Sequence, residues 1–204
     1  MRIDLKELEE LYTTNVQRYG INPMSVGWKD AESQRLRFKK LVEVIENEEN
    51  NIVVNELGCG YGAMFPFLIE GGFRIARYVG YDISPTMVEV ARNLVKDDRA
   101  EFIRAESITR EADYSFTSGI FNVKFNIEAM VWVKYIEEIL ENMDEHSRRG
   151  FAFNMLSTYV DFREDHLFYG DPFHFFNFCK RQFSKKVSLL HDYDLWEWTI
   201  CVKK

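Results

Sequence analysis

The fold of this chain is indicated by one stretch of sequence, Ile52-Val53-Val54-Asn55-Glu56-Leu57-Gly58-Cys59-Gly60-Tyr61-Gly62. Its first six residues are mostly apolar and β-branched, which is typical of a strand buried on both faces. In the glycine loop that follows, Gly58 permits a tight turn, Gly60 lets a ligand approach bare backbone, and Gly62 lets a helix begin close to the sheet. The free N–H groups of that helix would favour a small anionic group.

Strand-like and helix-like segments alternate after this stretch. We expect further strands over 75–81, 101–105, 114–118, 151–156, 187–190 and 196–202, and helices over 62–70, 84–95, 132–143 and 171–183. Such alternation predicts an α/β fold with a mostly parallel sheet and helices on both faces, and the short last connection indicates an antiparallel pair. The carboxyl ends of the parallel strands then meet at one edge, where ligands bind in such folds.

Composition limits the classes of protein that fit. The 204 residues suffice for one domain, and 26 basic against 33 acidic residues give a net charge of −7, which does not favour nucleic acid as a partner. The three cysteines are far apart, so we expect reduced thiols in a cytoplasmic protein. The charged N-terminus and the lack of a long apolar run predict neither a signal peptide nor a membrane span. We expect one domain, with an N-terminal helical cover over 1–48 and an α/β core over 49–204.

Acidic residues end three of the expected strands. Glu56 lies two residues before the first glycine, where a carboxylate repels a pyrophosphate and attracts an ammonium. Asp82 is placed to accept hydrogen bonds from ribose hydroxyls, and Glu106 to accept one from an adenine amine. A ligand with an amino-acid end, a ribose and an adenine is S-adenosylmethionine. The alternatives are that Asp82 caps the next helix and that Glu106 is an exposed strand-end acid.

The glycine loop alone leaves other functions open. Gly58, Gly60 and Ala63 satisfy a dinucleotide-binding fingerprint, so an NAD-dependent oxidoreductase is one alternative, and a tight turn without a ligand is another. Glu56 argues against the pyrophosphate of NAD. A third alternative is a non-catalytic binding module that acts through a partner, with 159–178 as its interface. Oligomeric state stays open between a monomer and a homodimer.

With these residues in place, 52–118 resembles the class I S-adenosylmethionine-dependent methyltransferases. The first motif of the family matches 53–62, the ribose-binding acid falls on Asp82 with Ile83 beside the adenine, and the third acid falls on Glu106, where the family more often has Asp. The resemblance implies a three-layer Rossmann-like sandwich with seven strands, the last antiparallel. It implies no metal, because the sulfonium already activates the methyl group. The cofactor contacts that we expect are Glu56, Gly58, Gly60, Gly62, Asp82, Ile83, Met87, Glu106, Ser107, Ser118, Tyr19 and Trp28.

The acceptor is less constrained by the sequence. The segment 183–204 resembles methyltransferases encoded among polysaccharide-assembly enzymes, which implies O-methylation of a small molecule such as a sugar or a nucleotide-linked intermediate. His191 and then His166 follow expected strands at the carboxyl edge, so we expect one of them to act as general base or substrate contact. A structural histidine is the alternative for each. Tyr12, Tyr19 and Trp28 would close over the cofactor from the N-terminal helices, with ordinary packing as the alternative, favoured for Tyr12.

Overall fold

The protein is described by a computed structural model that covers residues 3–46 and 51–204. Its strands are β1 (Ile52–Leu57), β2 (Ile75–Asp82), β3 (Ala100–Arg104), β4 (Ala112–Thr117), β5 (Ser147–Leu156), β6 (Lys186–Leu190) and β7 (Glu197–Lys203). Its α-helices are α1 (Lys6–Tyr19), α2 (Ala31–Leu41), α3 (Met64–Glu70), α4 (Pro85–Leu94), α5 (Ala129–Glu145) and α6 (Pro172–Gln182). Two short 3-10 turns, η1 (Pro23–Val26) and η2 (Val42–Val44), flank α2. The expected boundary between cover and core falls at 47–50, outside the described residues.

The strands form one seven-stranded sheet in the order β3-β2-β1-β4-β5-β7-β6. The pairs from β3 to β5 are parallel, and β7 runs antiparallel to both β5 and β6. The predicted fold class is therefore confirmed, including the antiparallel last strand. The main difference is that β5 begins at Ser147 rather than at 151. The Ser147 hydroxyl donates to the Met143 carbonyl oxygen at 2.6 Å, so the strand starts directly after α5.

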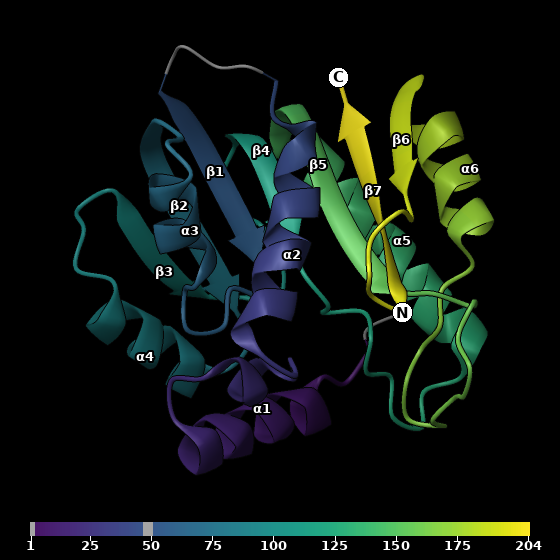
Figure 1. Ribbon diagram of the computed structural model, residues 1–204, viewed down its shortest axis with the longest axis horizontal. Coiled ribbons are helices and arrows are strands. Elements are labelled where there is room, and N and C mark those ends of the chain that lie inside the picture. Colours follow the sequence, from purple (N-terminus) through teal and green to yellow (C-terminus); the bar gives the residue numbers. More distant parts are fainter. Residues whose placement is uncertain (1–2, 47–50) are drawn as a thin grey trace.

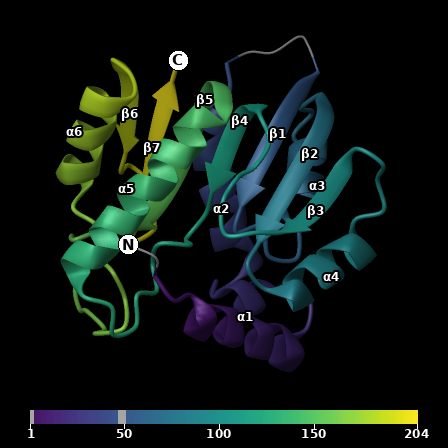
Figure 2. The same cartoon turned by 180° about the vertical axis from the view of Figure 1, so that it is seen from behind.

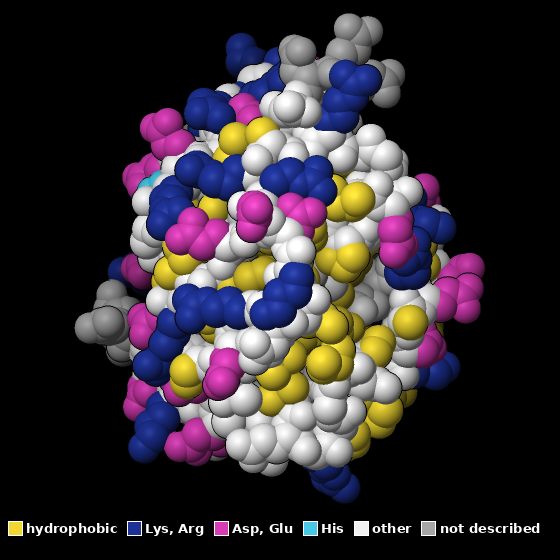
Figure 3. All heavy atoms as spheres, turned by 90° about the vertical axis from the view of Figure 1, so that its left-hand side faces the viewer, with side chains coloured by type: hydrophobic (Ala, Val, Ile, Leu, Met, Phe, Trp, Pro, Cys, Tyr) yellow, Lys and Arg dark blue, Asp and Glu magenta, His cyan; other side chains and the backbone are white. Residues whose placement is uncertain are grey.

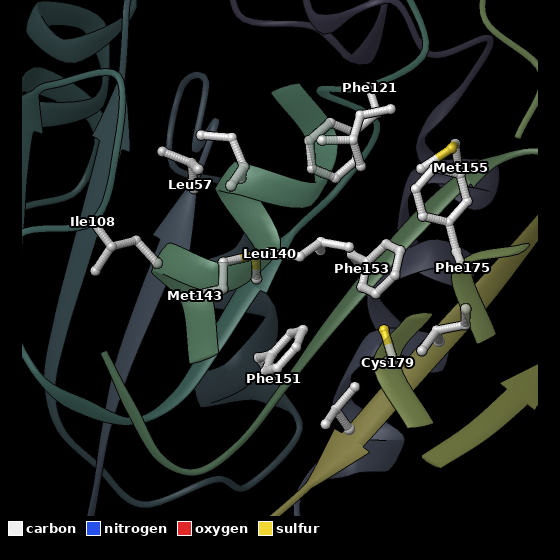
Figure 4. Packing of buried hydrophobic residues seen from close by; sticks show 14 of the residues in the cluster. Leu57, Ile108, Phe121, Leu140, Met143, Phe151, Phe153, Met155, Phe175 and Cys179 are labelled. Atoms are coloured by element: carbon white, nitrogen blue, oxygen red, sulfur yellow. The ribbon is translucent and has the colours of Figure 1, made fainter. Parts of the chain in front are cut away.

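Helices cover both faces of this sheet. Figures 1 and 2 show α2 and α3 on one face and α5 on the other, with α6 beside β6. On the α5 side, Phe151 and Phe153 of β5 pack with Leu140 and Met143 of α5, and Figure 4 shows Cys179 of α6 completing this cluster. Each face of β1 is thus buried under helices, as its apolar sequence requires.

The N-terminal segment lies across the carboxyl ends of the strands. In Figure 1, α1 lies below the arrowhead of β1 and beside α4. Leu5 and Leu8 of this segment are buried in the same cluster as Leu57, at the end of β1. These apolar residues therefore form a packing surface that closes the end of the sheet where a ligand site is expected.

Three further features concern the surface charges, the cysteines and the length of the helices. On the face seen in Figure 3, Lys and Arg side chains lie among Asp and Glu side chains. Cys59, Cys179 and Cys201 are all buried and unpaired, as predicted. Within residues 3–46 and 51–204, no helix combines the length and the apolar character required to cross a bilayer.

Candidate functional site

The glycine loop has the backbone geometry that its sequence predicts. Gly58 and Gly60 both have positive φ, 75° and 52°, which glycine adopts without the strain that a side chain would cause. A Cβ at Gly58 would lie 2.1 Å from the Ile120 Cγ2 atom, and one at Gly60 would lie 2.6 Å from the Val26 Cγ1 atom. The loop is therefore closely enclosed, by the segment after β4 on one side and by η1 on the other.

A cavity opens at the carboxyl ends of β1, β2 and β4, beside this loop. Nine of the twelve expected cofactor contacts line it: Glu56, Gly58, Gly60, Asp82, Ile83, Met87, Glu106, Ser118 and Trp28. Leu5, Leu8, Tyr12, Val26, Gln34, Tyr61 and Tyr135 are among its other lining residues. The nine expected contacts come from five separate stretches of sequence. Four of these stretches lie at the carboxyl ends of parallel strands, which is where the topology of such a sheet predicts a ligand site.

Three expected contacts, Gly62, Ser107 and Tyr19, are not among the residues that line this cavity. Gly62 packs under Phe102, whose ring carbons would lie 2.9 Å from a Cβ at this position. Ser107 follows Glu106 beyond the cavity lining. Tyr19 is 37% exposed, because it lies two helical turns beyond Tyr12 at the end of α1. Tyr12, for which ordinary packing was the favoured alternative, thus lines the cavity, whereas Tyr19, an expected cofactor contact, is exposed.

Glu56 is the most buried acid of the cavity, with 2% of its surface exposed. The Tyr78 hydroxyl of β2 donates a hydrogen bond to its Oε2 atom. Burial raises the pKa of Glu56 from 4.5 to about 8, and the hydrogen bond from Tyr78 works in the opposite direction. A cation bound beside this carboxyl group would therefore stabilise its ionised form against the effect of burial.

Asp82 connects the glycine loop to the start of α4. Its Oδ2 atom accepts from the Gly60 N–H and its Oδ1 atom from the Ser84 N–H, both at 2.9 Å. Burial raises the pKa of Asp82 to about 6, against the effect of these two donors. The helix cap is Ser84, whose hydroxyl accepts from the Met87 N–H at 3.2 Å. Asp82 is therefore not the cap of α4, and its carboxylate remains on the cavity wall.

Among the described residues, the cavity wall carries acidic side chains and no basic ones. Glu56, Asp82 and Glu106 contribute carboxyl groups, whereas no Lys, Arg or His is among the described residues that line it. Burial raises the pKa of Tyr12 to about 12, so this phenol stays neutral near neutral pH. Such a wall favours a cationic ligand and disfavours a pyrophosphate.

Trp28 covers the cavity from the N-terminal segment. A Cβ at Gly119 would lie 2.1 Å from its Cη2 atom, and the Arg37 guanidinium lies 3.8 Å from its ring centroid on the other side. Arg37 in turn forms a buried ion pair with Glu197 of β7, with Nη2 to Oε1 at 2.6 Å. Trp28 is thus fixed between the glycine after β4 and a buried cation.

The two histidines expected to act in catalysis lie outside the cavity lining. His191 is exposed after β6, with its ring centroid 5.8 Å from that of Tyr159. The His166 side chain is half exposed, and its Nδ1 atom lies 3.7 Å from the Glu164 carboxylate. Both loops follow strands at the carboxyl edge, as predicted, but the structure does not bring either ring to the carboxylates.

Comparisons with known proteins bear on what this site does. A family model described as a methyltransferase domain matches residues 54–150, from β1 through the glycine loop into β5. A relative from Mycobacterium tuberculosis (strain ATCC 25618 / H37Rv), Rv1506c, whose name marks it as a candidate methyltransferase, is 46% identical over 163 residues. The match covers 78% of this chain and 98% of the relative. The chain belongs to the methyltransferase family.

Solved structures share the fold of this methyltransferase at low identity. The magnesium protoporphyrin IX methyltransferase ChlM from Synechocystis PCC 6803 with bound SAM is 11% identical, with a TM-score of 0.66 over 99% of this chain and 98% of that one. The complex of DhpI with SAM and HEP is 13% identical, with a TM-score of 0.69 over 97% and 96% of the two chains. The predicted Rossmann-like methyltransferase fold is therefore confirmed.

Sequence reasoning missed three features of the methyltransferase site. Tyr78 lies in the middle of β2, and its contact with Glu56 follows only from the register that pairs Val54 with Tyr78 and Glu56 with Gly80. Tyr135 comes from α5, for which the sequence predicted a helix but no contact with the site. The ion pair of Arg37 with Glu197 joins residues 160 positions apart, and no local pattern indicates such a pair.

Proposed function

We propose that this methyltransferase binds S-adenosylmethionine in the carboxylate-lined cavity and transfers its methyl group to a small-molecule acceptor. The observation that carries the proposal is the wall of three carboxyl groups without a lining cation, at the end of a glycine loop. S-adenosylmethionine carries two cationic groups, a sulfonium and an ammonium, and therefore suits this wall. The pyrophosphate of NAD does not.

Each part of the wall has a role in binding. Glu56 would accept the ammonium, and the backbone of Gly58 and Gly60 would border the methionine end. Asp82 would accept the ribose hydroxyls, since each of its oxygens has a lone pair beyond those used by Gly60 and Ser84. Ile83 and Met87 would pack against the adenine, with Glu106 at its edge. Ser118 at the end of β4 borders the same cavity, and Trp28 excludes water from above.

When bound, the cofactor supplies a methyl group that its sulfonium makes electrophilic. The chain then has to bring an acceptor atom to roughly 3 Å in line with the breaking bond, which is mainly a matter of positioning. A hydroxyl acceptor also needs a base, typically worth ~10²–10⁴-fold in rate. His191 is our first candidate for this base and His166 the second, because both follow strands at the edge where the cavity lies. The loops that hold them would have to move toward the cavity when the acceptor binds.

For the acceptor, we propose O-methylation of a sugar or a nucleotide-linked intermediate of surface polysaccharide. Aromatic side chains at the carboxyl edge support this class. Tyr159 and Trp196 are 58% and 56% exposed, and His191 lies against Tyr159. Exposed aromatic faces with polar neighbours suit the apolar faces and hydroxyl edges of sugar rings.

The test has a binding arm and a transfer arm. Calorimetry with S-adenosylhomocysteine should show one site per chain, and NAD should show none; the reverse result contradicts the proposal. For transfer, the protein is incubated with S-adenosylmethionine labelled in the methyl group and a panel of nucleotide sugars. His191→Ala should lower turnover more than cofactor affinity. The matched control is His174→Ala: His174 lies on α6, and its Nε2 atom lies 3.0 Å from the Glu137 carboxylate of α5.

A further inference from the structure

Tyr78 lies beneath the candidate site and has a single polar contact among the described residues, its hydrogen bond to Glu56. Its side chain is fully buried. The ring packs between Phe65, at 5.4 Å between centroids, and Phe102, at 5.8 Å. This aromatic packing fixes the position of the hydroxyl, and the hydroxyl is directed at one oxygen of a carboxyl group on the cavity wall.

A hydroxyl in this position acts on the charge state of Glu56. A phenol donates to a carboxylate in a charge-assisted hydrogen bond, which is stronger than a bond between neutral groups. The bond therefore favours the ionised form of Glu56, against the burial that favours the protonated form. It uses one lone pair of Oε2, so among the described residues Oε1 keeps both of its lone pairs for a ligand cation.

The other groups that face Glu56 do not replace this donor. Asp82 of β2 repels its negative charge, and so does the nearby Cys59 thiol group when ionised. Tyr61 of the glycine loop donates its hydroxyl to Gln34 of α2 at 2.8 Å instead. Phe116, which pairs with Glu56 on the β4 side, is apolar. Among residues 3–46 and 51–204, Tyr78 is thus the one hydrogen-bond donor to the Glu56 side chain.

We propose that Tyr78 is a positioning residue for cofactor binding: its hydroxyl holds Oε2 of Glu56 and keeps the carboxylate available to the ammonium of the cofactor. This rests on the proposed function, because it requires that ammonium to meet Glu56. Below about pH 8, Glu56 of the free protein carries a proton that the ammonium must displace. Binding therefore releases a proton, and affinity rises with pH through this range.

The test uses S-adenosylhomocysteine as the probe, with calorimetry of three variants. Tyr78→Phe keeps the ring and removes the hydroxyl. Tyr81→Phe is the matched control, since Tyr81 is on the same strand, is fully buried on the other face and, within the described part of the chain, has no hydrogen-bond partner for its hydroxyl. At about pH 7, we expect roughly 10- to 100-fold weaker binding for Tyr78→Phe and no change for Tyr81→Phe.

The pH profile separates positioning from a merely structural role. The loss in Tyr78→Phe should shrink by roughly five- to tenfold between about pH 7 and about pH 9, because the higher pH ionises Glu56 even without the hydroxyl. The titration of the probe's own amine is common to both proteins and cancels. In a Glu56→Gln background, Tyr78→Phe should add less than about threefold, since no carboxylate is left to position.

Three results would overturn the inference. They are equal affinities for Tyr78→Phe and Tyr81→Phe, a loss that is constant with pH, or a loss that persists in full in the Glu56→Gln background. Failure of the proposed function gives a different result, because the unmodified protein would then bind no S-adenosylhomocysteine at any pH.

Discussion

Replacement of Glu56 by Gln should reduce the loss of stability that the ligand-free protein suffers as pH rises, while weakening its cofactor binding. Burial raises the pKa of Glu56 from 4.5 to about 8. The folded protein therefore holds a proton that the unfolded chain releases, and this group makes the free energy of unfolding fall as pH rises from 4.5 to about 8. The amide of Gln does not titrate, so the free energy of unfolding of the variant does not fall with pH on account of this group.

The size of this change in stability follows from the pKa of Glu56 in the two states, 4.5 in the unfolded chain and about 8 in the folded protein. Between about pH 5 and about pH 8, release of this proton by the unfolded chain should lower the free energy of unfolding by about 3 kcal/mol. The packing cost of the buried amide is the same at both pH values and cancels in the comparison. The stability difference between Glu56→Gln and the unmodified protein should therefore grow by about 3 kcal/mol in favour of the variant over this range.

Urea denaturation at about pH 5, 6.5 and 8, without ligand, measures this difference. Glu111→Gln is the control, because the Glu111 side chain is exposed and its replacement should leave the pH dependence unchanged. If the stability difference between the variant and the unmodified protein grows by less than about 1 kcal/mol from about pH 5 to about pH 8, the prediction is wrong. Such a result would mean that the environment of Glu56 does not disfavour its charge.

Other substitutions test other parts of the site. Gly119→Ala should cost about 1–3 kcal/mol in stability, because φ is 74° at this position and the new Cβ meets Trp28. The fluorescence of Trp28, isolated by comparison with Trp28→Phe, should shift in this variant. An unchanged spectrum would contradict the position of Trp28 over the cavity. Arg37→Met should cost about 3–5 kcal/mol by leaving Glu197 buried without its partner, and adding Glu197→Leu should recover part of that loss in the same denaturation assay. Asp82→Asn should weaken binding of S-adenosylhomocysteine at least about tenfold in calorimetry, and a smaller effect would argue against contact with the ribose.

Local patterns predicted the elements because their physical causes are local. The run over Ile52–Leu57 predicted a strand buried on both faces, and Gly58 and Gly60 predicted the turn that the structure shows. Ser84 before Pro85 predicted a helix start, and its hydroxyl does cap α4. The acids at or just after the ends of β1, β2 and β3 could be expected together because parallel strands end at one edge of the sheet.

The features that escaped prediction depend on contacts between distant segments. Tyr12 and Tyr19 differ by two helical turns, and only the position of α1 across the sheet decides which of them reaches the cavity. Trp28 is fixed by Arg37, whose partner comes from the last strand. His191 lies in a loop, whose path no periodic pattern describes.

The most direct test of the account is a crystal structure of the protein with S-adenosylhomocysteine. We predict that the amino group of the ligand lies within hydrogen-bond distance of Glu56 and that its ribose hydroxyls donate hydrogen bonds to Asp82. The Trp28 ring should cover the ligand. An adenosyl thioether bound elsewhere, or bound in the cavity with its amino group away from Glu56, would contradict the central claim that this buried carboxylate recognises the cofactor.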